Sequence, residues 1–285
     1  MVVVENGLGD FSFDWVLVQT RVSRFTRICT YDRAGYAWSD PGPKPRTFAQ
    51  INLELRDALR KLGERGPFVL VGHSFGGPVV RQFAADYPDP TAGMVLVDSV
   101  FEDQRVPIRG RAVRLRDGAV GKPFPPPREA MSDADRPARL ENPRSGPTQP
   151  LDPVFQHLPP NERRLRVWAA AQPALADAED SQREWSTESF ALMHAGQHVG
   201  ILGTIPLIVL TRAQGGYADD LDVSAAELDR ERKEGQARLA SLSTNSKQLV
   251  LDCGHSMHLE APASVAAAIR EVVQAVRNRT AFTNR

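Results

Sequence analysis

The sequence predicts an α/β fold: a mostly parallel sheet flanked by helices, with an inserted, mainly helical segment. Two observations support this. Short apolar runs alternate with helix-period segments up to about residue 100 and again after about residue 200, which is typical of a parallel sheet covered on both faces. Residues 101–200 break the alternation: their first half is rich in Pro and Arg, and their second half reads as short helices. We expect a core formed by residues 1–100 and 201–285, interrupted by a cap-like insertion at 101–200.

Six apolar runs are expected to form the strands, and two apolar stripes mark the clearest helices. The first stripe runs from Phe48 to Leu62 at helical spacing and stops at Gly63, a residue common at helix C-termini. The second runs from Val265 to Val276 near the end of the chain. The expected strands are residues 2–5, 27–32, 68–72, 94–100, 205–211 and 247–253.

Composition narrows the classes of partner. The 285 residues hold 35 acidic and 35 basic side chains, so no net positive field favours nucleic acid or an anionic membrane. Cys29 and Cys253 are too few for a disulfide framework and suit a reducing compartment. The N-terminus lacks the pattern of a secretory signal, and the longest apolar stretch, residues 200–210, is about half of the ~20 residues of a membrane span. We expect a cytoplasmic protein, and the scarcity of lysine, five of the 35 basic residues, suggests a bacterial genome rich in GC.

The stretch "GHSFG" at residues 72–76 places a serine between an expected strand and an expected helix. This is the G-x-S-x-G pattern of a nucleophile elbow. Glycines are required because strand and helix approach closely around the serine. The arrangement holds the hydroxyl of Ser74 above the sheet, beside free N–H groups of a helix N-terminus that favour negative charge.

A serine nucleophile needs a base, and His255 is the best placed of six histidines. It directly follows the last expected strand, in the region where the histidine of such sites comes in chain order. His258 is expected to pack at the start of the following helix, and His73 to point away from the site. His157 has no context that suggests a role.

Two weaker patterns point to metal or cofactor binding. His194 and His198 have the i, i+4 spacing of a zinc motif, but Ala195 replaces the glutamate and no third ligand is evident. Gly7, Gly9 and Ser12, with Asp32 further on, approach a dinucleotide fingerprint whose third glycine is missing. We therefore expect no cofactor and no metal.

Five segments together carry a family resemblance: "ENGLGD", "YDRAGYAWSD", "GHSFGG", "LVDSV" and "GHSMHLEAP". The chain resembles the α/β-hydrolase superfamily, in the capped branch that includes bacterial esterases, haloperoxidases, epoxide hydrolases and haloalkane dehalogenases. The resemblance implies that Ser74 attacks an acyl carbonyl and that His255 accepts its proton. It also implies an oxyanion hole formed by the backbone N–H groups of Phe75 and Leu8. Asn6 stands where relatives often have His.

The resemblance leaves the acid of the triad open between two places. Many relatives carry an Asp after the strand expected at residues 205–211, where this chain has Gly215, with Asp219 and Asp220 a turn later. Another branch carries it after the strand that follows the nucleophile helix, where Asp98 stands 24 residues beyond Ser74. We favour Asp98 and keep Asp219 and Asp220 as alternatives.

The expected function is hydrolysis of small carboxylic esters, with lactones next. A serine at the nucleophile position argues against epoxide hydrolase or dehalogenase chemistry, whereas a haloperoxidase side activity stays compatible. The alternative is a non-catalytic sensor with the same fold, which binds a small ligand under the cap. Relatives usually carry a β-hairpin before the first strand, so one sheet edge is expected to be short or covered; oligomeric state stays open. The candidate pocket residues are Trp168, Trp185 and Phe190. A group of arginines could attract an anionic substrate, but a solvent-exposed face is the simpler interpretation; the group is Arg105, Arg109, Arg111, Arg114 and Arg116.

Overall fold

The computed structural model describes residues 1–108, 110–128, 151–196, 200–213, 215 and 222–282. Its main sheet has six strands in the order β2-β1-β3-β4-β7-β8, and every neighbouring pair is parallel. The chain leaves β1 for β2 on one side and then returns to β3 on the other side of β1. Ligand sites of open α/β sheets lie outside the carboxyl ends of the strands at such a reversal. The strands are β1 (Val2–Glu5), β2 (Ile28–Thr30), β3 (Phe68–His73), β4 (Thr91–Val97), β7 (Leu207–Arg212) and β8 (Ser246–Leu251).

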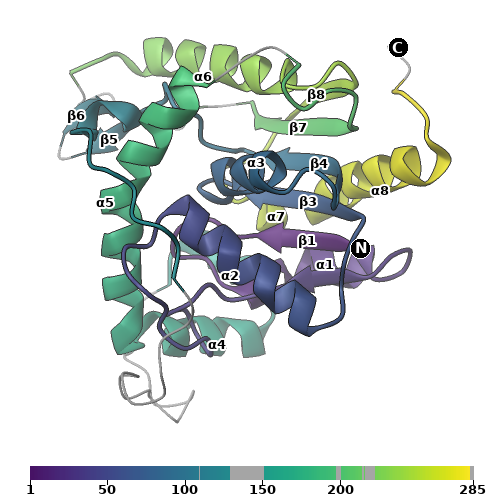
Figure 1. Cartoon of the computed structure of the whole chain (residues 1–285), viewed down its shortest axis with the longest axis horizontal. Helices are drawn as coiled ribbons and strands as arrows, with labels where there is room; N and C mark the ends of the chain where they lie inside the picture. Colours follow the sequence, from purple (N-terminus) through teal and green to yellow (C-terminus); the bar gives the residue numbers. More distant parts are fainter. Residues whose placement is uncertain (109, 129–150, 197–199, 214, 216–221, 283–285) are drawn as a thin grey trace.

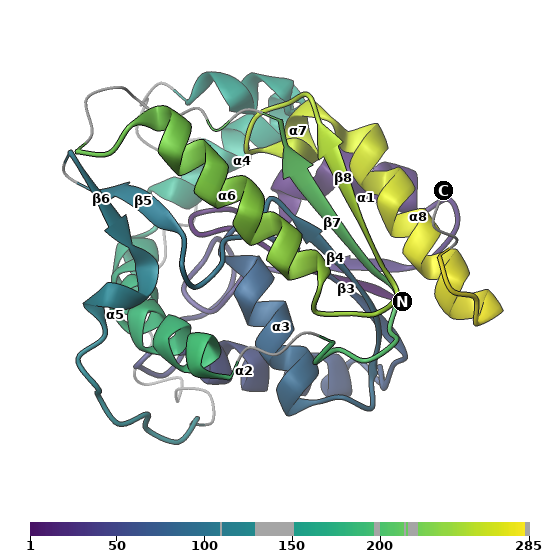
Figure 2. The ribbon, with the colours of Figure 1, turned by 90° about the horizontal axis from the view of Figure 1, so that it is seen from above.

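Helices cover both faces of this sheet (Figures 1 and 2). One face packs against α1 (Val16–Val22) and α8 (Pro262–Asn278). The other packs against α2 (Phe48–Lys61), α3 (Gly76–Asp86) and α6 (Ala225–Ala240). Successive side chains of a strand point to opposite faces, so Val95 and Val97 enter the first layer while Leu96 enters the second. The expected α/β fold, a mostly parallel sheet with helices on both faces, is confirmed.

The segment between β4 and β7 contains helices and one small antiparallel hairpin. The hairpin pairs β5 (Arg105–Ile108) with β6 (Arg111–Arg114) and was not predicted. Each of its strands has only four residues and begins with an arginine, and β5 contains Pro107. The local sequence pattern therefore did not predict a strand. Among the described residues of this segment, the other elements are η2 (Leu115–Gly118), η4 (Pro153–His157), α4 (Pro160–Ala170) and α5 (Pro173–Ala195). Two short elements outside this segment are η1 (Ser12–Trp15) and α7 (Met257–Glu260).

Over the described residues, no helix is both long enough and apolar enough to cross a membrane.

The turn from β3 into α3 depends on close backbone approach. A Cβ atom at Gly72 would lie 2.6 Å from the carbonyl oxygen of Gly76. A Cβ atom at Gly76 would lie 2.6 Å from the carbonyl oxygen of Asn6 and closer still to that of Glu5. Real Cβ atoms do not approach backbone oxygens this closely, so only glycine lets α3 begin against the end of β1. The contact places Ser74 beside the loop that follows β1.

Gly76→Ala is expected to destabilise the fold, because the added methyl group meets fixed backbone on β1. The free energy of unfolding, measured by urea denaturation, should fall by about 1–3 kcal/mol. Gly196→Ala is the matched control, since the nearest atom to its Cβ lies at 3.6 Å. Equal stability of the two variants would contradict the close approach.

Candidate active site

Ser74 sits in a left-handed backbone conformation at the turn between β3 and α3, with φ of 50°. Non-glycine residues in this region carry local strain that the surrounding structure must hold. Here the amide of Ser74 donates to the carbonyl of Val97 at 3.1 Å, and its carbonyl accepts from the amides of Gly77 and Val100, each at 3.1 Å. The end of β4 thus fixes the strained residue, as expected of a nucleophile elbow.

The structure brings Ser74, His255 and Asp98 together. The Nε2 atom of His255 lies 3.0 Å from the Oγ atom of Ser74, and its Nδ1 atom lies 2.6 Å from Oδ2 of Asp98. His255 comes from the loop between β8 and α7, and Asp98 directly follows β4. An imidazole that donates from Nδ1 to a carboxylate presents an unprotonated Nε2, which can accept a proton from the hydroxyl. The side chain of His255 is 42% exposed, so a substrate has access to it from solvent.

Asp98 is held as an anion by its surroundings. Burial disfavours its charge, but the hydrogen bond with His255 and the positive charges of Arg212 and Arg232 keep its pKa below the usual range. The Nη1 atom of Arg212 lies 3.4 Å from Oδ2, and that of Arg232 lies 4.0 Å from Oδ1. Asp98 is therefore ionised at neutral pH. The alternative acids, Asp219 and Asp220, lie outside the described residues.

The two predicted oxyanion residues pack in one apolar cluster. The side chains of Leu8 and Phe75 belong to one apolar cluster, together with Phe48 and Phe190. Among the described residues, no protein acceptor receives a hydrogen bond from the backbone amide of either Leu8 or Phe75. Phe75 directly follows Ser74, so its free N–H and that of Leu8 are the candidate donors to an oxyanion.

Arg33 supports the loop that carries Leu8, and the sequence analysis assigned it no role. Its buried guanidinium donates through Nη2 to the carbonyl of Asn6, at 2.8 Å, and to that of Gly7. The carbonyl of Gly7 and the N–H of Leu8 belong to one trans peptide unit and point in opposite directions. By holding the carbonyl on its own side, Arg33 turns the N–H of Leu8 the other way. The available signal was the arginine of "YDRAGY", a charged residue directly after an expected strand.

A buried ion pair lies behind this loop. Nε of Arg33 is 3.3 Å from Oε1 of Glu5, and both side chains are at most 1% exposed. Tyr31 also donates to Glu5, while Asn6 donates through Nδ2 to the carbonyl of Tyr31 at 2.8 Å. The side chain of Asn6, at the position where relatives often have His, therefore links the end of β1 to the end of β2.

The candidate pocket residues separate into different environments. Phe190 packs in the cluster of Phe48 and Phe75, close to the elbow. Trp168 belongs to another buried cluster, and Trp185 packs against Phe124 and Lys122. Only Phe190 among the three shares an apolar cluster with the elbow.

Three of the clustered arginines form ion pairs with acidic residues. Arg105 pairs with Glu227 and Glu231, Arg116 with Asp103, and Arg111 with Asp222. Arg114 forms part of β6, and Arg109 lies outside the described residues. These pairs favour the solvated face over an anion site.

Residues of the zinc-like and dinucleotide-like patterns form contacts within the protein. Nδ1 of His194 lies 3.1 Å from Asp103, and His198 is outside the described residues. Asp32 accepts hydrogen bonds from the backbone amide of Ser12 at 2.8 Å and from its hydroxyl at 3.1 Å, so the carboxylate closes its own loop. His157 lies exposed in η4.

Two of the histidines near the elbow are buried behind the site. His258 packs at the start of the helical segment after β8, as predicted, and stacks on Trp15 with ring centroids 4.9 Å apart. His73 does not reach Ser74, as predicted, but it contacts the backbone of His255.

Comparison with known proteins places the chain in a family. The model of a family described as "Alpha/beta hydrolase family" matches residues 1–268. Lipase LipV of Mycobacterium tuberculosis is 29% identical over 251 residues, which are 85% of this chain and 82% of that protein. An uncharacterized vacuolar membrane protein of Saccharomyces cerevisiae is 36% identical over 107 residues, but these are only 17% of its length.

Solved structures share the fold at low sequence identity. An esterase from Thermogutta terrifontis superposes with a TM-score of 0.62 at 21% identity, covering 96% of this chain and 89% of the esterase. The epoxide hydrolase CorEH gives a TM-score of 0.60 at 14% identity, covering 97% and 92%.

Arg33→Met is expected to lower the free energy of unfolding by about 3–5 kcal/mol at neutral pH, because it leaves Glu5 buried without its cation. Burial already raises the pKa of Glu5 beside Arg33. When burial raises the pKa of a carboxyl in the folded state, the free energy of unfolding falls as the pH rises above the pKa that this carboxyl has in the unfolded chain. The deficit of the variant should therefore grow between pH 5 and pH 8 in urea denaturation.

The double variant Arg33→Met with Glu5→Gln should recover part of this loss and flatten its pH dependence. Arg27→Met is the control, because Arg27 forms an exposed pair with Glu64 that contributes at most about 1 kcal/mol. A loss at Arg33 no larger than that at Arg27 would contradict the buried pair.

Proposed function

Because the chain belongs to the alpha/beta hydrolase family, we propose that it is a serine hydrolase that cleaves carboxylic esters of small molecules through an acyl-enzyme on Ser74. One observation carries the proposal. The imidazole of His255 bridges the hydroxyl of Ser74, at 3.0 Å, and the carboxylate of Asp98, at 2.6 Å. A nucleophile, a base within reach and an acid that orients the base are the parts that acyl transfer requires.

In the first half of the reaction, Oγ of Ser74 attacks the carbonyl carbon of the ester while Nε2 of His255 accepts its proton. The anionic tetrahedral intermediate is stabilised by the N–H groups of Leu8 and Phe75. Its collapse breaks the bond to the alcohol oxygen, which takes the proton from His255 and leaves as the free alcohol. The acyl group stays on Ser74.

In the second half, water attacks the acyl-enzyme with His255 again as general base. The carboxylic acid is released and the hydroxyl of Ser74 is restored. Throughout, Asp98 remains ionised, since its pKa lies below the usual range, and stabilises the imidazolium of His255. No cofactor takes part in this scheme.

Ester hydrolysis is supported over ring opening of epoxides by the identity of residue 74. Epoxide hydrolases of this family form an alkyl-enzyme ester through a carboxylate, whereas a serine hydroxyl forms an acyl-enzyme. The likeness to CorEH, at 14% identity, concerns the fold. The names of LipV and of the Thermogutta esterase agree with ester substrates.

An apolar acyl group suits the surface beside Ser74. Leu8, Val100 and Leu115 are partly buried and pack against the cluster of Phe75 and Phe190, and apolar linings favour apolar ligands. Phe190 comes from α5, which also accepts a hydrogen bond from Arg33 through Gln182 at 3.0 Å. In this proposal residues 101–200 serve as a cap whose helix α5 is tied to the oxyanion loop and contributes to the acyl site.

Ser74→Ala is expected to abolish hydrolysis of p-nitrophenyl esters, with kcat/KM lower by about 10³-fold or more. The assay is a panel of esters of increasing acyl length together with lactones, and short to medium aliphatic esters should be the best substrates. Ser23→Ala, at an exposed residue, is the matched control. A phosphonate probe should add one mass equivalent to the wild type and none to Ser74→Ala. Failure to label the wild type would favour a ligand sensor.

Asp98→Asn is expected to lower kcat by about 10³–10⁴-fold, because the amide no longer selects the tautomer with a free Nε2. Steady-state kinetics of this variant should be compared with those of Asp219→Asn and Asp220→Asn. Near-normal turnover of Asp98→Asn, with a loss in either of the others, would reverse the assignment of the acid.

A further inference from the structure

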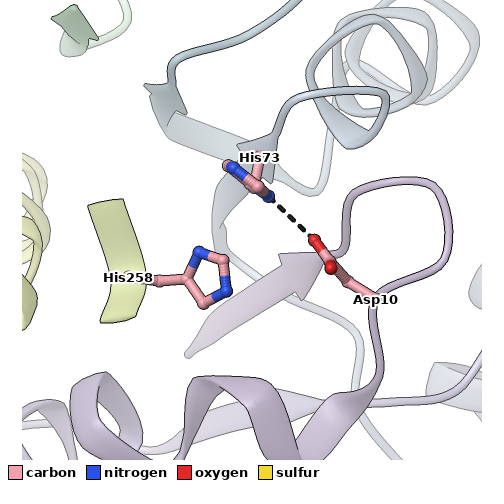
Figure 3. A group of neighbouring side chains, drawn as sticks. All are labelled: Asp10, His73 and His258. Atoms are coloured by element: carbon pink, nitrogen blue, oxygen red, sulfur yellow. Dashed lines mark hydrogen bonds and ion pairs between the residues drawn. The ribbon is translucent and has the colours of Figure 1, made fainter. Parts of the chain in front are cut away.

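A second acid–histidine pair lies behind the candidate site, on the far side of the His255 backbone. His73 is the last residue of β3, directly before Ser74. Its Nε2 atom lies 3.0 Å from the carbonyl oxygen of His255, and its Nδ1 atom lies 3.1 Å from Oδ2 of Asp10. The side chains of His73 and Asp10 are 2% and 12% exposed. Figure 3 shows Asp10 and His73 joined by this contact, with the ring of His258 beside them.

The partners determine where the protons are. A carbonyl oxygen only accepts, so Nε2 of His73 carries a hydrogen and donates it to His255. Burial would raise the pKa of Asp10, but the hydrogen bond with His73 and the charges of His73 and Arg166 hold it well below the usual range. Burial likewise opposes the charge on His73, yet its contacts with Asp10 and with the His255 carbonyl raise its pKa. An ionised Asp10 and the carbonyl of His255 both only accept hydrogen bonds, so this geometry requires a proton on each ring nitrogen of His73.

The rings around the pair exclude water. His258 is fully buried, and neither of its ring nitrogens has a hydrogen-bond partner among the described residues. Burial, followed by the charge of His73, lowers the pKa of His258 well below its usual value, so it is neutral. Its ring lies 4.6 Å from that of His73 and stacks on Trp15. Hydrogen bonds strengthen in a dry environment, so this wall favours the contact between His73 and His255.

Asp10, His73 and His258 each have one potential metal-ligand atom, and these atoms lie within 4.8 Å of one another. A metal ion is therefore the alternative to the hydrogen-bonded pair. The charge around them opposes it. Arg166, from α4, already lies 3.7 Å from Oδ1 of Asp10 and also pairs with Asp14. A divalent cation would replace the proton on Nδ1 of His73 and stand next to this guanidinium. The hydrogen-bonded pair is the arrangement that the surroundings support.

We propose that Asp10 and His73 are positioning residues for the general base: Asp10 orients His73, and His73 holds the carbonyl of His255 so that its ring spans Ser74 and Asp98. The inference rests on the proposed function of His255. Its physical basis is that His73 is adjacent to Ser74 in the chain, so its N–H is fixed relative to the nucleophile. His255 sits in a loop after Gly254 and is 42% exposed, so its ring has few other restraints.

The kinetic test compares His73→Met, which removes the donor, with His73→Gln, which retains an N–H near the position of Nε2. His73→Met should lower kcat on the best p-nitrophenyl ester by on the order of 10²-fold, the cost of misplacing a catalytic group by about 1 Å. KM should stay within about twofold, since His73 does not touch substrate. His73→Gln should recover most of kcat. His157→Met is the control for the substitution at an exposed histidine.

The spectroscopic test does not need turnover. Long-range ¹H–¹⁵N NMR of the histidine rings, in the wild type and in Ser74→Ala, should show His73 as an imidazolium from pH 6 to pH 8. The downfield Nδ1 proton of His255, bonded to Asp98, should be present in both proteins and in His73→Gln, and weakened or lost in His73→Met. Asp10→Asn should convert His73 to the neutral tautomer that keeps its proton on Nε2, because the amide can donate to Nδ1.

The outcomes distinguish failure of the positioning role of His73 from failure of the proposed hydrolase function. A wild-type His73 with no proton on Nε2 at pH 7, a folded His73→Met with wild-type kcat, or a His73→Gln as impaired as His73→Met would overturn the positioning role. If His73→Met does not fold, Asp10→Asn and His73→Gln decide it by the His73 and His255 resonances. If the phosphonate leaves wild-type Ser74 unlabelled, the hydrolase proposal fails, whereas the NMR signals still report whether His73 holds His255.

Discussion

Parallel strand pairing is the constraint on which the site depends. In a parallel sheet all carboxyl ends meet at one edge, and each part of the candidate site follows one of them. Leu8 follows β1, Ser74 follows β3 and Asp98 follows β4, while His255 comes four residues after β8. The strand order places β1, β3 and β4 side by side, so residues far apart in the chain converge without a long loop. Antiparallel pairing would send alternate ends to opposite edges.

Two of the four described non-glycine residues with positive φ lie at the same edge. Ser74 and Asp98 both have left-handed conformations, with φ of 50° and 38°. Hydrogen bonds from the next strand hold each of them: Ser74 donates to Val97 at 3.1 Å, and Asp98 donates to Leu210 at 2.9 Å. Each strained residue is thus fixed by the end of its neighbouring strand, and a stable sheet can support an unfavourable local conformation where it aims a side chain.

Two buried pairs of charged side chains contact the loops that carry site residues. The two core layers beside the sheet are built from apolar side chains, whereas these pairs lie next to the loops of Leu8 and His255. Glu5 with Arg33 supports the oxyanion loop, and Asp10 with His73 lies behind the base. Buried ion pairs contribute little net stability but fix geometry, because each partner is costly to leave alone. The contacts of Arg33 with the loop of Leu8 and of His73 with the loop of His255 therefore serve position more than stability.

The sequence by itself determined the features that depend on local pattern. The spacing of apolar residues identified the parallel α/β core. The glycines around Ser74 identified the elbow, because the backbone geometry there tolerates few other residues. The place of His255 followed from the family resemblance and its position after the last strand. The sequence favoured Asp98 as the acid but left Asp219 and Asp220 as alternatives, since each follows an expected strand.

Only the tertiary structure placed Asp98 against His255, joined Arg33 to the oxyanion loop and turned His73 toward the base. It also revealed the hairpin of β5 and β6 and assigned Phe190, rather than Trp168, to the cluster at the elbow. The physical reason is common to these cases. A local pattern records which face of a strand or helix is apolar, whereas the partner of a polar side chain depends on which strand ends become neighbours, and that is decided by strand order and by packing across the whole chain.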